Sequence, residues 1–360
     1  MIKENHLSTY KMTLTVKTPV FIGSGNKLAK KEYLRNDKDK TISFLNQEKF
    51  FDLLIRKGLV DSYESFVLGN DNDLRRFLIN NRVSQQEMDS VCISTLSAKN
   101  AVANGQSLKS HDLHSFIRSC ENKVYVPGSS IKGALRTVLL LYFVLGDKNK
   151  DNVLDETKYF NKLNLKLKKD KDGKIDKRDY VNSIMRGIYV SDSLPIPDSQ
   201  MTFAGKADYS ADGVTNKINL IRECIGEGAR IESYITLDNS VLKNSVTIKT
   251  IKNVIMIFNK YYRSTFLPLF PMTKKSKDMF TDTSLLLGGG SGFFGKSVIY
   301  PFMGKDKAVD KLSNVIFNSK MYEKHKHWQD VDYGISPRML KCTYQNGELV
   351  HMGICEVEFE

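Results

Sequence analysis

The order of elements along the 360-residue chain predicts an α+β fold of the ferredoxin-like class with large insertions. Three observations carry this prediction. Alternating apolar residues near the N-terminus indicate a strand, two apolar stripes at helical spacing lie within residues 131–142 and 251–262, and short strands lie between and after them. Strand, helix, strand, strand, helix, strand is the order of a split βαβ fold.

The first strand is predicted over residues 11–22, KMTLTVKTPVFI. Its apolar residues all occupy even positions, which is the spacing of one buried strand face: Met12, Leu14, Val16, Val20 and Ile22. Because Pro19 cannot donate to a ladder, the second half should be an edge or a bulge before the turn at Gly23-Ser24-Gly25. A helix is expected over 46–57, ended by Gly58, and residues 61–120 are expected to form an inserted helical segment.

Residues 124–146, VYVPGSSIKGALRTVLLLYFVLG, predict a strand, a Pro-Gly turn and a buried helix. Later elements are strands at 187–190 and 229–237, a helix striped by Ile251 to Tyr262, and a hairpin turn at Asn346-Gly347. The charged run at 166–179 is typical of a solvated loop, and a Lys-rich linker is expected at 273–278.

The composition favours some classes of partner and excludes others. Lys plus Arg number 54 against 41 Asp plus Glu, a net charge of +13, so a polyanion such as nucleic acid is the expected partner. The longest uninterrupted apolar run, Val138 to Leu145, is far shorter than the ~20 residues that span a bilayer. No secretory signal is evident, so we expect a cytoplasmic protein that does not contact membranes. Five cysteines without a C-x-x-C pair predict buried free thiols rather than disulfides or a zinc site.

Residues 290–297, GSGFFGKS, match the Walker A pattern letter for letter. The context argues against a nucleotide-binding loop, since Pro301 follows Lys296 by five residues and a helix should begin there. We interpret the glycines as backbone that approaches a phosphodiester, with Lys296 adding charge and Phe293 and Phe294 adding stacking faces. The alternative is that Gly288 to Gly290 only permit a tight turn under a core Phe pair.

The segment VPGSSIKGALR offers a second anion-binding element. Amides of Ser129, Ser130 and Ile131 at a helix N-terminus would favour an anion. Lys132 and Arg136 lie four residues apart and share one face. An ordinary capped helix with solvated basic residues is the alternative.

The histidines His111 and His114 flank Asp112, which suggests a metal-dependent phosphohydrolase, but no second ligand cluster appears nearby. Solvated side chains are therefore the favoured interpretation there and at His325 and His327. No G-x-S-x-G elbow or other nucleophile pattern is present.

Four landmarks together resemble the RAMP superfamily of CRISPR proteins, and within it the fifth Csm subunit of type III-A effector complexes. They are TPVFIGSG at 18–25, PGSSIKGALR at 127–136, YVSDS at 189–193 with RECIGEGARIESYI at 222–235, and GGGSGFFGK at 288–296. The resemblance implies a tandem RRM-like fold: an N-terminal domain over 1–190 and a C-terminal one over 191–360 that carries the glycine-rich loop.

The resemblance also implies function. Such a subunit is a non-catalytic, guide RNA (crRNA)-binding part of an antiviral ribonucleoprotein. It caps the filament at the crRNA 3′ side, contributes to crRNA maturation, and contacts the RAMP backbone subunit and the small helical subunit. Whether a cellular nuclease is recruited is left open. The related backbone subunit, which cuts target RNA, carries an Asp after its first glycine turn, whereas Lys27, Lys30 and Lys31 dominate here.

We therefore expect no catalytic residue, metal or cofactor. The predicted RNA-binding residues are Gly23, Ser24, Gly25, Lys27, Lys30, Lys31, Gly128, Ser129, Ser130, Lys132, Gly133, Arg136, Gly288, Gly289, Gly290, Ser291, Gly292, Phe293 and Lys296. Two alternatives stay open: a metal-dependent ribonuclease that uses Glu32 or the His111-Asp112 pair, and an assembly adaptor whose RNA contacts are incidental.

Overall fold

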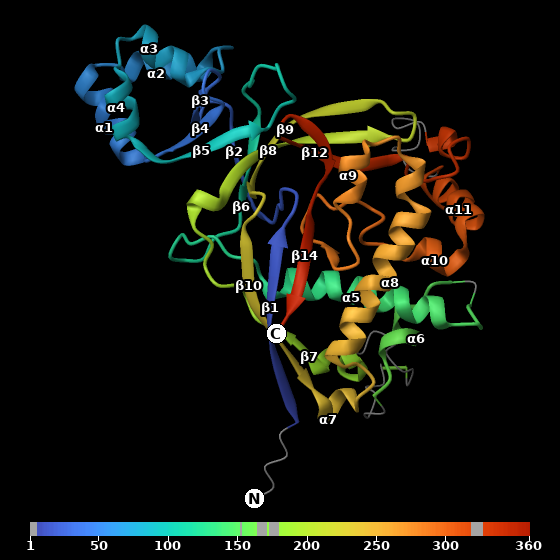
Figure 1. Cartoon of the computed structure of the whole chain (residues 1–360). Helices are drawn as coiled ribbons and strands as arrows, with labels where there is room; N and C mark the ends of the chain where they lie inside the picture. The colour runs from blue at the N-terminus through green and yellow to red at the C-terminus, as the bar shows by residue number, and fades with distance from the viewer. Residues whose placement is uncertain (1–5, 152, 164–170, 173–179, 318–326) are drawn as a thin grey trace, which may run out of the picture.

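The computed structural model describes residues 6–151, 153–163, 171–172, 180–317 and 327–360 (Figure 1). Most of the charged run predicted as a solvated loop at 166–179, and His325, lie outside these residues. The described chain forms two curled sheets, each built from strands of both the early and the late parts of the sequence. A layer of helices covers the first sheet, and a helical lobe lies at the far end of the second.

The first sheet has five strands, all paired antiparallel. Their spatial order is β11 (Ser284–Leu286), β14 (Ile354–Phe359), β1 (Leu7–Val16), β10 (Arg230–Asp238), β7 (Ile188–Val190). Helix α5 (Gly128–Gly146) lies between β1 and β7 in the chain, and α8 (Ile248–Thr265) lies between β10 and β14. The predicted α+β class is confirmed, and the order β14-β1-β10-β7 is that of a split βαβ unit with β11 added at one edge.

The strands of the second sheet come from the chain segments that connect the strands and helices of the first layer. Its order is β2 (Gly23–Leu28), β6 (Asp112–Phe116), β9 (Thr215–Ile225), β8 (Met201–Ser210), β5 (Cys92–Asn100), β4 (Thr41–Leu45), β3 (Tyr33–Asn36). The strand β12 (Met339–Gln345) also pairs with β8, and β13 (Glu348–His351) pairs with β12. Both sheets therefore take strands from both sides of residue 190, so the two predicted domains are interleaved.

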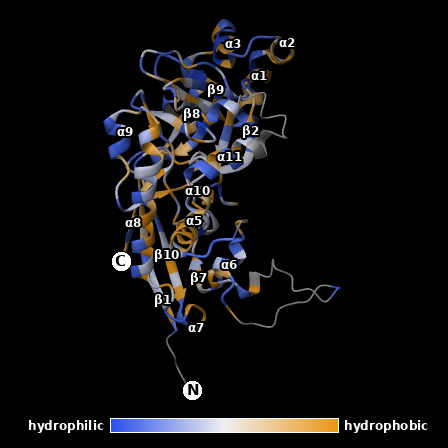
Figure 2. Ribbon diagram, turned by 90° about the vertical axis from the view of Figure 1, so that its right-hand side faces the viewer, coloured by the Kyte–Doolittle hydropathy of each residue, from blue (hydrophilic) through white to orange (hydrophobic). Residues whose placement is uncertain are grey.

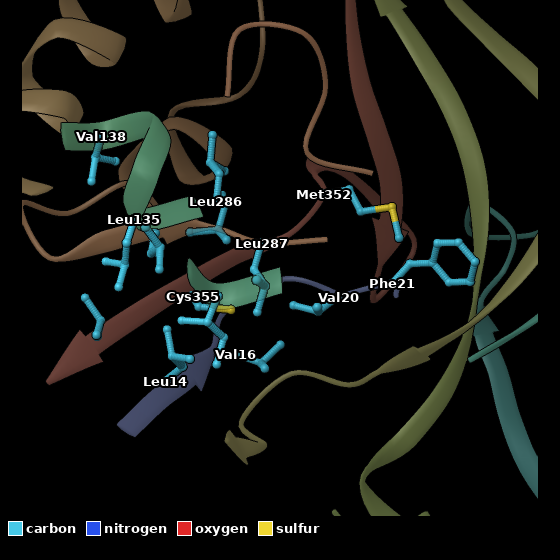
Figure 3. Close-up of a cluster of buried hydrophobic side chains, with 14 of the residues drawn as sticks. Leu14, Val16, Val20, Phe21, Leu135, Val138, Leu286, Leu287, Met352 and Cys355 are labelled. Carbon is cyan, nitrogen blue, oxygen red and sulfur yellow. The ribbon is translucent and has the colours of Figure 1, made fainter. Parts of the chain in front are cut away.

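Helices α5 and α8 pack against each other on one side of the first sheet. Among the described helices, α5 alone is long and apolar enough to cross a membrane. Eight of its residues are buried here, so it is a core helix. Figure 3 shows Leu135 and Val138 of α5 above Leu14 and Val16 of β1. The ribbon of α8 carries its hydrophobic residues along one side (Figure 2), as the predicted stripe requires.

The helical lobe has a hydrophobic cluster of its own, separate from the main core. It comprises α1 (Gln47–Lys57), α2 (Val60–Leu68), α3 (Leu74–Asn80) and α4 (Gln85–Ser90). The α1 bounds match the predicted helix, with Asn46 as N-cap and Gly58 as left-handed C-cap. The predicted helical insertion holds only as far as residue 90, because β5 and β6 follow it within 61–120.

Short 3-10 turns lie between several elements, and five further α-helices are described: α6 (Glu156–Phe160), α7 (Asn239–Leu242), α9 (Lys274–Asp278), α10 (Ile299–Met303) and α11 (Lys305–Phe317). The predicted Lys-rich linker at 273–278 is therefore helical. The predicted hairpin joins β12 and β13, and both Asn346 and Gly347 have positive φ, as a type I′ turn requires.

Three local predictions are wrong. The first strand ends at Val16, and only an isolated bridge at Val20 continues it past Pro19. Residues 124–126 likewise contribute only isolated bridges, from Val124 to Arg118 and to Ile196, instead of a strand. All five cysteines are free, but Cys120 is exposed and Cys92 half-buried, so only three are buried thiols.

Candidate nucleic-acid interface

Three segments remote in sequence meet beside the first turns of α5. They are the residues after β1, the helix itself, and the glycine loop, defined here as residues 288–296. Between them lies a cavity of about 440 Å³, which we call the glycine groove. Its lining is Ile22, Gly23, Ser129, Ser130, Gly133, Ala134, Thr137, Leu286, Gly288, Gly289, Gly295 and Lys296.

Close backbone contacts fix the glycine loop in place. The amide of Gly289 donates to the carbonyl of Phe21 at 2.7 Å. A Cβ on Gly288, whose φ is +85°, would lie 2.3 Å from the same oxygen. A Cβ on Gly290 would lie 2.2 Å from the sulfur of Met352. At these positions glycine is therefore a packing requirement, independent of any ligand.

Two side chains of the loop are structural. Phe294 is buried and stacks on Phe266, with ring centroids 4.5 Å apart, so it offers no face to a base. Ser291 is fully buried, and its hydroxyl donates to the Gly288 carbonyl at 3.0 Å. Phe293 is half-buried and Lys296 is exposed, so these two keep a surface that RNA can reach.

The loop does not form a nucleotide-binding P-loop, as the sequence context indicates. The strand before it, β11, pairs antiparallel with β14. The helix after it, α10, has only five residues and contains Pro301. A P-loop needs a parallel strand and a helix whose first amides face the phosphates.

Two of the three amides predicted to face an anion, those of Ser130 and Ile131, are already hydrogen-bonded, which corrects the expectation for these two. The Gly128 amide donates to the Asp192 carboxylate at 2.7 Å. The amides of Ser130 and Ile131 both donate to the Pro127 carbonyl. The helix thus contributes hydroxyls to the groove: those of Ser129 and Ser130 make no hydrogen bond within the described chain.

The PGSS and YVSDS motifs pack against each other. A Cβ on Gly128 would lie 2.2 Å from the Val190 carbonyl, so only glycine fits there. The amide of Val126 donates to the Ser193 hydroxyl at 2.9 Å, and the Ser193 amide donates back to the Val126 carbonyl. Their co-occurrence in the sequence therefore has a structural cause.

Lys132 and Arg136 lie on a different flank of α5 from the glycine groove. They line a separate cavity of about 310 Å³ with Glu156, Phe160 and Arg186. Arg136 forms an ion pair with Glu156, and its guanidinium lies 4.6 Å from the centre of the Phe160 ring. Burial lowers the pKa of Lys132. Lys132 and Arg136 therefore do not line the cavity that the glycine loop lines.

The lysines after the first glycine turn have different environments. Lys31 donates to the carbonyls of Phe66, Val67 and Gly69 at 2.6–2.9 Å, which fastens the helical lobe to the sheet. Its charge is thus used within the fold. Lys27 is exposed on β2 and pairs in register with His114 of β6, while Lys30 is half-buried near His111. The predicted turn Gly23-Ser24-Gly25 is instead the start of strand β2; its three residues are exposed, and Gly23 lines the groove.

A row of basic residues on the second sheet was missed from the sequence. We define the basic row as Lys27, His114, Arg222 and Lys206. His114 is in register with Lys27 on one side and with Arg222 of β9 on the other. The alternation of β9 alone could have placed Arg222 on one sheet face, but the β6–β9 pairing is parallel and joins residues over 100 positions apart.

Burial and neighbouring positive charges lower the pKa values of the basic groups in and beside the row. Burial and then the charge of Lys27 lower the pKa of His114. Burial lowers the pKa of Lys206, with Asp208 opposing the shift. Burial and the nearby Arg222 lower the pKa of Lys296. The charge of Arg222 in the basic row thus acts on Lys296 of the glycine loop.

The alternative metal site finds no support. Among the described residues no group of three or more His, Cys, Asp and Glu side chains could hold a metal ion. Glu32 accepts a hydrogen bond from the Ala29 amide within its own turn. His111 is half-buried, and His327, expected to be solvated, is buried and hydrogen-bonded to Asp330 at 2.8 Å.

Comparison with known protein families identifies the family to which this chain belongs. The model of the RAMP superfamily matches residues 13–315, a range that contains all four sequence landmarks. The chain belongs to the RAMP superfamily. The glycine loop and the PGSS helix described above thus lie in a RAMP protein.

Curated relatives within the RAMP group are named "CRISPR system Cms protein Csm5". The one from Streptococcus thermophilus is 28% identical over 308 residues, covering 82% of this chain and 81% of the relative. The one from Mycobacterium tuberculosis is 24% identical over 382 residues and covers 98% of both chains. The predicted resemblance to the fifth Csm subunit of type III-A CRISPR complexes is confirmed.

Two solved structures share the fold. The crystal structure of Csm5 from T. onnurineus has a TM-score of 0.65 at 17% identity and covers 96% of this chain and 99% of its own. A chain in the cryo-EM structure of the Csm-crRNA-target RNA ternary complex has a TM-score of 0.63 at 17% identity, with 97% and 100% covered. At this identity the likeness concerns the fold alone.

Proposed function

We propose that this RAMP protein is a non-catalytic, guide RNA-binding subunit of a type III-A Csm complex. It caps the filament at the crRNA 3′ side and contributes to crRNA maturation and antiviral defence. The observation that carries the proposal is the glycine groove, where Gly23, α5 and the glycine loop meet next to unpaired cations. The relatives named Csm5 and the fold shared with a chain of a Csm-crRNA complex support the same assignment.

The groove suits a sugar-phosphate strand. Its walls are glycine backbone, the Ser129 and Ser130 hydroxyls and the Lys296 ammonium, and these groups recognise phosphate and ribose without reading bases. Binding of this type falls with salt, by a slope of about −0.7 for each phosphate neutralised on a single strand. Lys27 and Phe293 extend the proposed contact surface beyond the groove.

The experiment uses two helical glycines with open space around them. A Cβ on Gly133, in the groove, or on Gly146, at the other end of α5, would meet no atom within 4 Å. Gly133→Glu fills the groove with a negative side chain, whereas Gly146→Glu adds the same charge outside it. We expect purified complexes with Gly133→Glu to lose at least about tenfold in crRNA affinity and those with Gly146→Glu to match the parent.

Equal crRNA retention by both variants would remove the groove from the RNA path. The non-catalytic part of the proposal has its own assay, in which the purified chain is incubated with labelled single-stranded RNA and Mg²⁺ or Mn²⁺. Metal-dependent cleavage that Glu32→Ala or Asp112→Ala abolishes would instead assign a ribonuclease.

A further inference from the structure

Arg222 is an enclosed guanidinium without a carboxylate partner. It lies over the Phe21 ring, 4.9 Å from its centre, and its Nη1 is 3.5 Å from the sulfur of Met352. Its Nε is buried and has no hydrogen-bond partner in the described chain. In Figure 3 the Phe21 and Met352 side chains lie at the edge of the core cluster that faces the second sheet.

Arg118, an enclosed arginine just after β6, is by contrast fully paired. Arg118 forms ion pairs with Glu223 at 2.5 Å and with Asp198 at 3.0 Å. The carboxylate that acts most on Arg222, Asp208, is paired with Lys341 at 2.7 Å. A guanidinium enclosed in this way without an anion costs free energy, and the cost is recovered when an anionic ligand binds.

The glycine loop lies directly beside Arg222. A Cβ on Gly290 would lie 3.2 Å from Nη1 of Arg222 and 2.2 Å from the Met352 sulfur that this nitrogen contacts. Lys296 of the loop has no ion-pair partner in the described chain, and Lys206 and His114 flank Arg222 on the sheet. Three cations and one histidine thus gather where the glycine loop meets the second sheet.

We propose that Arg222 is the centre of a phosphate-binding site at which the RNA strand leaves the glycine groove and crosses the second sheet along the basic row. The guanidinium offers a fork of N–H donors, which matches two oxygens of one phosphodiester. Lys296 and Lys206 would neutralise the same or the next phosphate. The claim that the bound anion belongs to RNA rests on the proposed function. The claim that Arg222 binds phosphate stands independently of it.

The first test measures thermal unfolding of the full chain with inorganic phosphate as the probe, against chloride at equal ionic strength. We expect phosphate to raise the melting temperature of the parent by roughly 2 °C or more at millimolar concentrations. Arg222→Met should lose this response. Because Met packs against Phe21 and Met352 without an unpaired charge, its melting temperature without phosphate should equal or exceed that of the parent.

The matched control is Arg230→Met, which removes the same charge from an exposed position on the first sheet and should keep the phosphate response. Arg222→Lys, which keeps the charge but loses the fork, should respond more weakly than the parent. Two results would overturn the site: a phosphate response that persists in Arg222→Met, or a parent that responds no more to phosphate than to chloride.

The RNA measurement separates this inference from the proposed function. Arg222→Met should weaken crRNA binding about fivefold or more, and Arg230→Met should not. If Arg222→Met loses the phosphate response but binds crRNA as well as the parent does, Arg222 lies outside the RNA path. That result would overturn the claim that the RNA strand passes Arg222. A parent that binds phosphate at Arg222 but no crRNA contradicts the proposed function alone.

Discussion

Helix α5 separates two basic surfaces that look alike in sequence but differ in structure. On one flank, Lys132 and Arg136 line a cavity with Glu156, and the Arg136 charge is used by that carboxylate and by Phe160. On the other flank, Lys296 and Arg222 have no carboxylate within ion-pair distance in the described chain, and the walls are glycine backbone. The comparison teaches that the number of basic residues does not show how much of their charge remains available to a ligand.

The largest expected effect separates two glycines of the same helix. A methyl group on Gly128 overlaps the Val190 carbonyl, whereas Gly133 faces open space. We expect Gly128→Ala to lower the free energy of unfolding by at least about 3 kcal/mol. Gly133→Ala should raise it by up to about 1 kcal/mol, because alanine favours the helix. Urea unfolding measures both, and equal stability of the two variants would contradict the described packing.

The second prediction concerns the titration of His351, which is next in sequence to Met352, the residue that packs against the glycine loop. His351 is fully buried behind Met352, and its Nε2 accepts from the Tyr262 hydroxyl at 2.9 Å. Burial lowers its pKa to about 4. Because the folded state resists a proton that the unfolded chain accepts, stability is full above pH 6.5 and falls as pH drops towards 4.

The loss attributed to His351 is on the order of 3 kcal/mol over that range. We expect His351→Gln to unfold more easily at neutral pH but to lose much of this acid sensitivity, as measured by urea midpoints from pH 7 to pH 4. If the parent and the variant lost stability in parallel, His351 would not be the group that titrates.

A third prediction compares single lysines from the two flanks. Lys296→Ala should weaken crRNA binding about fivefold at 0.1 M salt and make the salt slope shallower by about 0.7. Lys132→Ala should leave the affinity within about twofold, because its cavity lies away from the groove. Filter binding across a salt series tests both. A Lys132→Ala defect as large as that of Lys296→Ala would extend the RNA surface to both flanks and break the comparison.

The smallest effect is expected from Arg136. Its removal frees Glu156 and uncovers the Phe160 ring, so Arg136→Ala should cost about 1 kcal/mol of stability with crRNA affinity unchanged. Thermal unfolding and binding of the same preparation measure the two quantities. Weaker binding without a loss of stability would show that Arg136 contacts RNA directly.

The sequence predicts those features that depend on local chemistry. Asn46 and Gly58 bound α1 because a cap and a left-handed position are local, and the Asn346-Gly347 turn is likewise local. Gly128 and Asp192 were both within motifs, yet their hydrogen bond spans 64 positions and no spacing rule joins them. Arg222 was missed for the same reason, since its neighbours come from β6, β8 and the glycine loop. Helical spacing correctly placed Lys132 and Arg136 on one face of α5, but it could not show that this face lines a cavity separate from the glycine groove.

The interleaving of the two sheets has a consequence for synthesis. Strand β1 pairs with β10 and β14, and Met12 lies opposite Phe359. At 5–20 residues per second, a ribosome adds β10 about 10 to 45 seconds after β1 and adds β14 about 20 to 70 seconds after it. Until β10 is made, β1 has no native neighbour on either edge, and the edge that pairs with β14 stays open longer. The apolar side chains of β1 are therefore exposed to non-native contacts during this time.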